Sequence, residues 1–323
     1  MRARDRTVTA FAPASISNVG AGFDAFGCAI TGAGDTVHAR LTSQPGVVVA
    51  SSGHPSIPTE ASRNTAGIAA RETLRRAGAN DAGVELRVEK GLPLSGGQGG
   101  SAASAAAAAV AVNSLLESLP RTQRGAALGA HDLLEACLTA EEAVAGRHAD
   151  NVAPALLGGF VIVRAIDPTD IVALPTPDDL RIVIAHPAYE MRTAEARAVL
   201  PQQVTRAVAV AQAANAAATV AALAAGDYDL LRRSLVDLIA EPVRAPLLPG
   251  FREARDAALD AGAYGSSISG SGPTVFALAR GDAAGTTIAG AMRRAYEAAG
   301  IQCAVRVSRV DREGARVVAG GAA

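Results

Sequence analysis

The sequence predicts an α+β protein of two domains, covering residues 1–166 and 167–323. Strand-like stretches alternate with long alanine-rich stretches of helical character, and 323 residues with 49% hydrophobic composition are ample for a large buried core. Residues 167–179 hold three prolines and four aspartates, a composition typical of a surface connection between domains. We therefore place the domain boundary at residue 166.

In the first half, turn-rich strands and three helices are expected. Strand-like segments joined by glycine turns run from Val8 to Leu41, and further strands are expected at 84–90 and within 159–165. The expected helices cover residues 64–77, 101–116 and 131–145. A polar turn at 146–151 follows the last of these helices.

The second half opens with a strand at 181–185 and continues with two or three alanine-rich helices between Thr193 and Ala263. A glycine turn then runs into a strand over 265–279, and a final helix and strand complete the domain. Polar residues interrupt the apolar run 207–225, which favours a packed helix of a soluble protein over a membrane span.

The charge, the N-terminus and the cysteines exclude several classes of protein. The formal net charge is -1 with both signs spread along the chain, so no surface for nucleic acid or an anionic membrane is expected. No apolar run of signal-peptide length follows the N-terminal arginines, which favours a cytoplasmic protein. Cys28, Cys137 and Cys303 are odd in number and far apart, so neither a disulfide framework nor a thiolate zinc site is expected.

Lys90 is the only lysine of the chain, which excludes further mechanisms. A P-loop, a protein kinase and a pyridoxal enzyme each need a lysine within a particular motif, and Lys90 lies in none of them. No H-E-x-x-H or G-x-S-x-G motif occurs, so zinc peptidases and serine hydrolases are not favoured.

A glycine-rich loop, Pro93-Leu-Ser-Gly-Gly-Gln-Gly-Gly-Ser101, stands directly before the alanine-rich helix. N–H groups at a helix start lack internal partners and glycines let an oxyanion approach them, so the pattern predicts a phosphate site that needs no lysine. A plain turn with Ser101 as helix cap is the alternative. The loop also matches G-x-G-x-x-A, but Glu117 ends an uninterrupted helix instead of a second strand, which disfavours a Rossmann site.

Two neighbouring carboxylates, Glu141 and Glu142, precede the polar turn that contains His148. One oxygen ligand suffices for Mg²⁺ where phosphates and water supply the others, so this pair is a candidate metal site. Alternatively, both glutamates belong to a solvated helix face and His148 is a local capping residue. A further small-residue loop at 264–274 leads into an apolar strand and by itself is compatible with a simple turn.

Together and in this order, the three motifs resemble those of the superfamily of galactokinase, homoserine kinase, mevalonate kinase and phosphomevalonate kinase. Four segments are similar to the homoserine kinase family within it, at 11–24, 148–160, 193–201 and 241–250. The resemblance extends over nearly the whole chain. It implies an N-terminal domain like the second domain of ribosomal protein S5 and a ferredoxin-like C-terminal domain.

The resemblance also implies the reaction, which is ATP-dependent phosphorylation of the hydroxyl of L-homoserine with Mg²⁺ in threonine biosynthesis, by a cytoplasmic homodimer. The ATP-binding residues that it implies are Pro93, Leu94, Ser95, Gly96, Gly97, Gln98, Gly99, Gly100, Ser101 and Ala102. Glu141 matches the family's magnesium-binding glutamate by its spacing to His148, with Ser101 as a further ligand and Glu142 as the alternative to Glu141.

An amino-acid substrate calls for arginine at its carboxylate and for a carboxylate at its ammonium group. By resemblance, Arg197 and Arg244 hold the substrate carboxylate and Asp24 holds the ammonium. Asn151 orients the hydroxyl rather than deprotonating it. The catalytic and substrate-binding residues implied in this way are Asn18, Asp24, His148, Asn151, Thr193, Arg197, Arg244 and Gly270.

Two loop residues depart from the usual family pattern, since Gln98 replaces leucine and Gly100 replaces serine. The lost hydroxyl is expected to weaken phosphate or metal binding, and Gln98 either replaces a packing contact with a polar one or meets the nucleotide. Two alternatives therefore stay open. One is a non-catalytic nucleotide or amino-acid sensor on the same fold, and the other is a sibling kinase for another alcohol, such as mevalonate.

Overall fold

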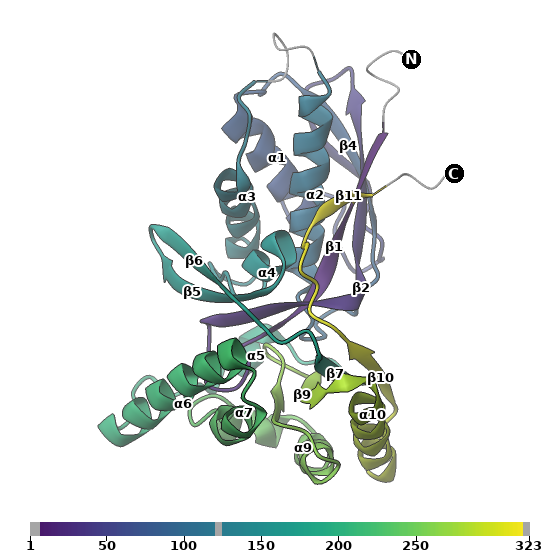
Figure 1. The fold of residues 1–323 in the computed structure, drawn as a ribbon. Coiled ribbons are helices and arrows are strands. Elements are labelled where there is room, and N and C mark those ends of the chain that lie inside the picture. The colour runs from purple at the N-terminus through teal and green to yellow at the C-terminus, as the bar shows by residue number, and fades with distance from the viewer. Residues whose placement is uncertain (1–6, 120–124, 319–323) are drawn as a thin grey trace.

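A computed structural model describes residues 7–119 and 125–318 and confirms the α+β class (Figure 1). The strands of its first sheet are β1 (Thr7–Ser17), β2 (Phe26–Thr42), β3 (Gly46–Ser51), β4 (Gly83–Glu89), β5 (Phe160–Ile166), β6 (Thr169–Leu174) and β11 (Arg316–Val318). Their order is β11-β1-β2-β4-β3, and β5 pairs with the start of β2 and with β6. The first sheet therefore joins strands from both ends of the described chain.

Helices cover one face of this sheet (Figure 1), namely α1 (Thr65–Ala77), α2 (Gly100–Glu117), α3 (Ala130–Glu142) and α4 (Val152–Leu157). α2 lies at the centre and packs against β1, β2, α1 and α3. Most of its buried side chains are alanine, whose small size lets the helix approach the sheet and its neighbours closely. α1 is bounded by local signals, since the Asn64 side chain caps its first turn and Gly78, at φ 72°, ends it.

The second sheet is antiparallel and contains β7 (Leu180–Pro187), β8 (Ser266–Ile268), β9 (Val275–Arg280) and β10 (Cys303–Ser308) in the order β10-β7-β9-β8. The remaining helices are α5 (Thr193–Ala198), α6 (Arg206–Ala225), α7 (Tyr228–Ser234), α8 (Glu241–Arg244), α9 (Phe251–Asp260) and α10 (Gly281–Ala298), with a 3₁₀ turn at Ala245–Leu247. This β-α-β-β-α-β succession is that of a ferredoxin-like domain.

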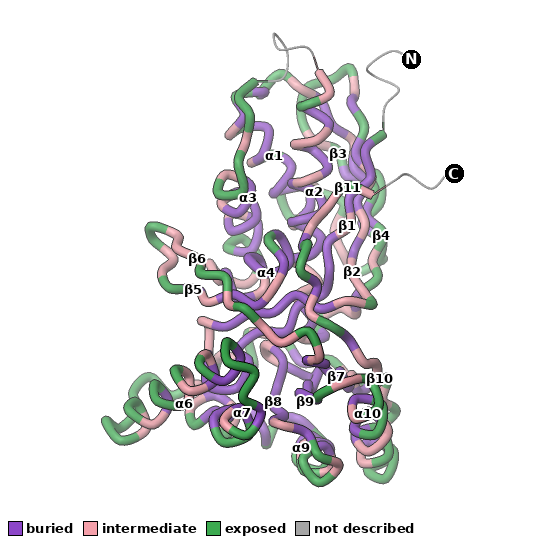
Figure 2. Tube along the Cα trace, in the orientation of Figure 1, coloured by how far each residue is buried: buried purple, intermediate pink, exposed green. Residues whose placement is uncertain are grey.

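The first unit contains the first sheet and α1 to α4, and the second unit contains the second sheet and α5 to α10. The two units are joined by shared apolar packing through β7. Successive strand residues point to opposite faces of a sheet. Ile182 and Ile184 belong to the core of the first unit, whereas Val183 and Ala185 belong to a second core with α9 and α10. Figure 2 shows buried segments in the interior of both units and exposed ones along the outer helices. The second sheet therefore has one face on each core.

Most of the expected elements are present, but β3, β6, β11 and α4 were not expected. The expectation of two or three helices between Thr193 and Ala263 is wrong, because five helices, α5 to α9, form there, three of them with seven residues or fewer. The helices expected at 64–77, 101–116 and 131–145 are α1, α2 and α3. The expectation of a simple surface connection at 167–179 is wrong in part, because β6 forms there and pairs with β5. β11 pairs with β1, so strands beyond residue 166 also belong to the first sheet. The division of the chain at residue 166 stays a prediction.

α6 departs from the packed helix that its sequence suggested. It extends away from the rest of the molecule as a largely exposed helix (Figure 2), and only 22% of the residues in its most apolar stretch are buried. Among the described residues it is the one helix long and apolar enough to cross a membrane. This rests on length and composition alone, which is weak evidence for a membrane segment.

Candidate active site

A cavity of about 410 Å³ lies where the two units meet, within the usual size range of small-molecule sites. The predicted site residues that line it are Asn18, Asp24, Pro93, Leu94, Ser95, Gly96, Gly97, Gly99, Gly100, Ser101, Glu141, His148, Asn151, Thr193, Arg197, Arg244 and Gly270. Two predicted residues, Gln98 and Ala102, are buried and do not line it. Segments separated by more than a hundred residues in the sequence thus converge on one cavity.

The glycine-rich loop is held from the second unit through its carbonyl groups. The Ser269 hydroxyl donates a hydrogen bond to the carbonyl oxygen of Gly97, and the Thr274 hydroxyl donates to that of Gly96. Both loop residues line the cavity. These two bonds fix the loop against the second unit.

The start of α2 follows this loop and offers unpaired N–H groups. Gly99 precedes the helix at φ 69°, a left-handed conformation that suits glycine, and a Cβ there would lie 2.1 Å from Ser15 Oγ. No side chain caps the helix, so Ser101 is not the cap that the alternative interpretation required. The first-turn N–H groups, which lack intrahelical partners, are therefore suited to bind an anion.

Lys90 lies against this helix start, although no sequence motif pointed to it. Its ammonium group forms an ion pair with the fully buried Asp35, and donates to the Gly100 carbonyl oxygen at 2.9 Å and to Ser104 Oγ at 3.0 Å. An ammonium group has three N–H donors, and these contacts use all three. Lys90 therefore fixes the first turn of α2 rather than presenting a free charge to the cavity.

Glu141 and Glu142 are separated by the rotation of α3. Glu141 is buried at the cavity, and its Oε2 atom has no hydrogen-bond partner among the described residues. Burial raises the pKa of Glu141 to about 7, the Ser101 hydroxyl lowers it, and the Asp150 carboxylate raises it further. Glu142 is exposed instead, 3.8 Å from Arg147, outside the cavity. Glu141 is the residue whose position fits a metal ligand.

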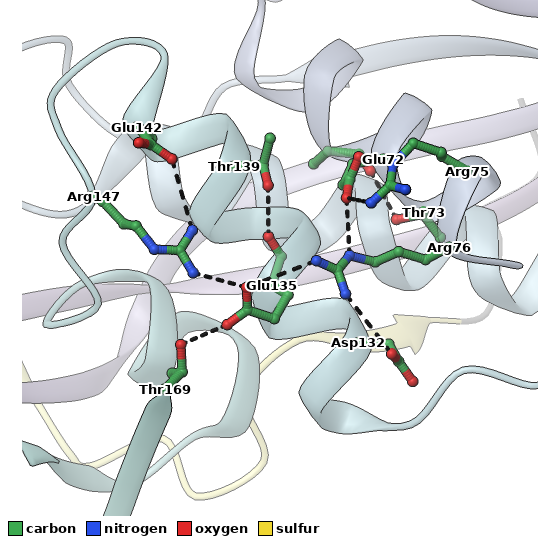
Figure 3. A network of polar contacts seen from close by, with 11 residues as sticks. Glu72, Thr73, Arg75, Arg76, Asp132, Glu135, Thr139, Glu142, Arg147 and Thr169 are labelled. Atoms are coloured by element: carbon green, nitrogen blue, oxygen red, sulfur yellow. Dashed lines mark hydrogen bonds and ion pairs between the residues drawn. The ribbon is translucent and has the colours of Figure 1, made fainter. Parts of the chain in front are cut away.

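An ion-pair network fixes the turn that follows α3, and Figure 3 shows it. Glu135, on α3, accepts hydrogen bonds from Arg147 at 2.8 Å and from the Thr169 hydroxyl at 2.5 Å, and Arg76 of α1 lies 3.7 Å away. Arg147 directly precedes His148, which lines the cavity. The network thus ties the turn to α1, α3 and β6 through Glu135 and Arg147, which do not line the cavity.

Asn151 is held between two serines of β1. Ser15 Oγ donates to Asn151 Oδ1 at 2.9 Å, and Asn151 Nδ2 donates to Ser17 Oγ at 2.9 Å, so its amide orientation is fixed. The preceding residue, Asp150, is buried at the cavity. Burial raises the pKa of Asp150 to about 6, and the Asp24 carboxylate adds to the rise.

Asp24 and Arg197 both line the cavity and form an ion pair with each other. Arg197 Nη2 lies 3.0 Å from Asp24 Oδ1, and Nη1 lies 3.3 Å from Oδ2. The Asp24 backbone N–H donates to Asn18 Oδ1 at 3.0 Å, and His148 Nδ1 is 3.8 Å from Asp24 Oδ2. Burial and the Arg197 charge lower the pKa of His148, against the pull of Asp24. The groups expected to bind opposite ends of an amino acid are thus paired with each other.

Arg244 is a nearly buried cation on the same side of the cavity, 4% exposed. Its Nε donates to the Ala196 carbonyl oxygen at 3.0 Å and its Nη1 to the Gly270 carbonyl oxygen at 2.9 Å, which also accepts from Asn18 Nδ2 at 2.9 Å. Its guanidinium carbon lies 5.2 Å from the centre of the Phe23 ring. These contacts set its orientation and leave further N–H donors for a ligand.

Gln98 takes the first of the two roles that the sequence left open, because it makes a polar contact and does not line the cavity. Its Nε2 donates to Thr274 Oγ1 at 3.2 Å, and His186 Nδ1 contacts the same oxygen at 3.0 Å. Gln98 Oε1 is buried without a partner. Glutamine therefore replaces a packing contact with a polar one between the two units. The Thr193 hydroxyl, at 3.5 Å from Ser271 Oγ, does line the cavity as expected.

Comparison with known proteins shows the family of this chain. Residues 64–159 match the model of the GHMP kinases N-terminal domain and residues 219–298 match that of the GHMP kinases C-terminal domain. The homoserine kinases of Chloroherpeton thalassium and Arabidopsis thaliana are 40% and 41% identical to this chain, covering 97% of it and 100% and 85% of their own lengths. The chain belongs to the homoserine kinase family.

Solved structures agree with this family assignment. The crystal structure of homoserine kinase from Cytophaga hutchinsonii is 41% identical, covers 97% of both chains, and has a TM-score of 0.91. Galactokinase of Lactococcus lactis, solved with galactose, is 17% identical with a TM-score of 0.68, so that likeness shows the fold alone. The two-domain GHMP kinase fold expected from the sequence is confirmed.

Relative to the homoserine kinase resemblance, the structure adds residues that the sequence did not single out. Asp150 stands between two predicted residues, His148 and Asn151, and could have been included on that ground. Lys90 could not, because its partner Asp35 lies 55 residues away and no local pattern links the two. The roles of the predicted site residues stay predictions.

Proposed function

We propose that this protein transfers the γ-phosphoryl group of ATP to the side-chain hydroxyl of L-homoserine, forming O-phospho-L-homoserine in threonine biosynthesis. The observation that carries the proposal is the set of groups that line one cavity. It holds an uncapped helix start suited to phosphates, a buried carboxylate whose Oε2 atom lacks a hydrogen-bond partner among the described residues, and opposed charges suited to an amino acid. Relatives that are homoserine kinases over nearly the full chain support it.

Phosphoryl transfer depends mainly on alignment and on neutralising charge. In this proposal the loop glycines and the first-turn N–H groups of α2 bind the phosphates, and Lys90 keeps that turn in place. Glu141 and Ser101 hold Mg²⁺, which when bound neutralises charge on the phosphate oxygens. Glu141 suits a cation because its unpartnered oxygen is buried at the cavity. Among the described residues no cluster of three metal-ligating side chains occurs, so phosphates and water would supply the other ligands.

The acceptor side of the cavity uses the remaining groups. Arg197 and Arg244 bind the substrate carboxylate and Asp24 binds its ammonium group. The Asn151 amide, fixed by its two serine partners, orients the acceptor hydroxyl toward the phosphoryl group. An amide has no basic site of useful strength, so the hydroxyl proton would pass to the transferred phosphoryl group or to solvent. We further infer a cytosolic homodimer, in line with the family resemblance.

The test is a turnover assay on the purified protein. We expect ADP release with Mg-ATP that depends on homoserine, and mass spectrometry should detect the phosphorylated product. Glu141→Ala should lower kcat at least about 100-fold, since it removes a charge that acts at the reacting phosphates. The neighbouring Glu142→Ala should leave kcat unchanged, because Glu142 lies outside the cavity. ATP binding without turnover would favour the sensor, and turnover of mevalonate would favour a sibling kinase.

A further inference from the structure

The Thr274 hydroxyl has three polar contacts at the junction of the two units but only one proton to donate. The Gly96 carbonyl oxygen can only accept a hydrogen bond, so its contact with Thr274 Oγ1 uses that proton. Gln98 Nε2 donates to the same oxygen at 3.2 Å, and His186 Nδ1 lies 3.0 Å from it. Because the Thr274 proton is already used, the contact with His186 is a hydrogen bond only when His186 Nδ1 carries a proton.

This requirement selects one of the two neutral forms of the His186 ring. A neutral imidazole has its proton on Nδ1 or on Nε2, and the nitrogen without the proton is an acceptor. With the proton on Nε2, His186 Nδ1 would compete with the Gly96 carbonyl oxygen for the Thr274 proton. Burial lowers the pKa of His186 and the Arg306 charge lowers it further, so the neutral ring is favoured over the protonated one.

Arg306 and Thr274 lie on opposite sides of His186. The strand of His186, β7, stands between β10, which carries Arg306, and β9, which directly follows Thr274. Arg306 is paired in register with Ile184, two residues from His186, so both side chains lie on the same face of the sheet. Burial lowers the pKa of Arg306, and no carboxylate among the described residues raises it. A positive charge on this side attracts the lone pair of Nε2 and so favours the proton on Nδ1.

The bond from Thr274 fixes the direction of a peptide unit that borders the cavity. The Gly96 carbonyl group and the Gly97 N–H belong to one planar trans peptide and point in opposite directions. Gly97 lines the cavity, and its N–H donates to no backbone carbonyl group among the described residues. The imidazole also packs directly on the loop, because a Cβ on Gly96 would lie 3.1 Å from His186 Cε1.

We propose that His186 is a positioning residue whose Nδ1–H form keeps the glycine-rich loop ready to bind phosphate, an inference that rests on the proposed function. The Nδ1–H donor leaves the Thr274 proton to Gly96, and the Gly97 N–H then faces a bound phosphate. When Nδ1 is an acceptor, the Thr274 proton turns to it, the Gly96 carbonyl group is released, and the peptide unit is free to rotate. His186 does not line the cavity, so it acts through Thr274 alone.

Ring ¹⁵N chemical shifts test the proton position directly, because protonated and unprotonated ring nitrogens differ widely in shift. The sample is the full chain without ligands at pH 8, and the His186 signals are those of the five histidines that vanish in His186→Asn. We expect a protonated Nδ1 and an unprotonated Nε2. Arg306→Met removes the charge and keeps an unbranched side chain, so it should increase the population that has its proton on Nε2.

Two substitutions of His186 separate a donor from an acceptor at the position of Nδ1. His186→Asn keeps an N–H donor there, so the dissociation constant for Mg-ATP should stay within about twofold of the wild-type value. His186→Asp offers only acceptors, so this constant should rise about tenfold, as for one lost hydrogen bond, while that for homoserine stays unchanged. His131→Asp makes the same exchange at an exposed histidine in the first turn of α3 and should change neither constant. Calorimetric titration measures both.

A double substitution separates the role of the proton position from the general effect of charge. Arg306→Met should weaken Mg-ATP binding about threefold in the wild-type background, in step with its effect on the ring. In the His186→Asn background the same change should have no effect, because asparagine has no ring proton to relocate.

Three results would overturn the inference. The first is a His186 ring with its proton on Nε2 in the wild type, which requires no variant to fold. The second is an equal loss of Mg-ATP affinity in His186→Asn and His186→Asp, which would make His186 a packing contact. The third is an equal effect of Arg306→Met in both backgrounds. Failure of the proposed function is separate, because homoserine-dependent ADP release would be absent while the ring proton and the Mg-ATP affinities still follow these expectations.

Discussion

At the scale of single residues, Glu141 is the clearest case of a side chain whose ionised form destabilises the folded chain. Burial raises its pKa from 4.5 to about 7, so the folded chain binds the Glu141 proton more tightly than the unfolded chain does. Stability from this group is therefore fully present below about pH 4.5 and is lost as the pH rises through about 7. A buried carboxyl with a raised pKa at a cavity is typical of a functional site.

Glu141→Gln tests this, because glutamine keeps the shape and removes the charge. We expect the variant without ligands to unfold at a higher temperature than the wild type at pH 8, and to differ much less at pH 5. The rise in the pKa of Glu141 from 4.5 to about 7 corresponds to at most about 3 kcal/mol at pH 8. The measurement is thermal unfolding at both pH values, with Glu142→Gln as an exposed control. Equal unfolding temperatures of the wild type and Glu141→Gln at pH 8 would contradict the raised pKa of Glu141.

The choice between Glu141 and Glu142 also shows where sequence reasoning ends. The spacing to His148 favoured Glu141 and left Glu142 as the alternative, and only the rotation of α3 shows which side chain enters the cavity. Gln98 is similar, because its contact with Thr274 joins residues 176 apart in the chain. Residue types and motif order were readable from the sequence, whereas partners from distant segments were not.

At the scale of elements, the turn between α3 and α4 depends on the ion-pair network of Glu135 and Arg147 (Figure 3). The turn contributes His148, Asp150 and Asn151 to the cavity, yet neither member of the network lines it. Arg147→Met should lower kcat with homoserine about tenfold and change the KM for ATP little, because the acceptor groups shift while the loop does not. Steady-state kinetics with both substrates checks the split.

Two further variants show whether Arg147 acts by positioning. Arg147→Lys should recover part of the lost kcat, since lysine can still reach Glu135. Arg75→Met removes an exposed arginine that pairs with Glu72 on α1, and it should leave kcat unchanged. Stability should fall by less than about 1 kcal/mol in each case, as is usual for surface pairs. If the fall in kcat of Arg147→Met is fully explained by a smaller fraction of folded protein, Arg147 has no positioning role.

Elements differ in how readable they are from the sequence. α1 and α2 have strong periodicity or composition and clear limits, such as Asn64 before α1 and the glycines before α2. β11 has three residues, and its partner β1 lies about 300 residues earlier, so no local pattern could reveal it. β6 lies in a segment rich in proline and aspartate and exists because β5 is beside it. Tertiary pairing, rather than propensity, forms these strands.

At the scale of the whole molecule, the Thr274 hydroxyl connects the two units at the glycine-rich loop. It donates to the Gly96 carbonyl oxygen and accepts from Gln98, with His186 at 3.0 Å. Thr274→Val keeps the shape but leaves these buried groups without a partner, at about 1–3 kcal/mol. We expect the KM for ATP to rise about tenfold, because the loop is no longer held from the second unit. Kinetics at saturating homoserine measures it.

The matched control is Thr287→Val, which removes an exposed hydroxyl that bonds only within α10. It should leave the KM for ATP at the wild-type value. If Thr274→Val lowers the unfolding temperature and leaves the KM for ATP unchanged, the hydroxyl stabilises the junction without shaping the loop.

The return of β11 to β1 has a consequence for cleavage of the chain between the two sheets. All strands of the second sheet end by Ser308, so loss of Arg316–Val318 leaves every strand of that sheet in place. The same loss would uncover the edge of β1 at Thr9–Phe11, and its unpaired backbone N–H and C=O groups could then pair with a strand of another molecule. A single cut between Ser308 and Arg316 would therefore convert a covered sheet edge into a site of aggregation.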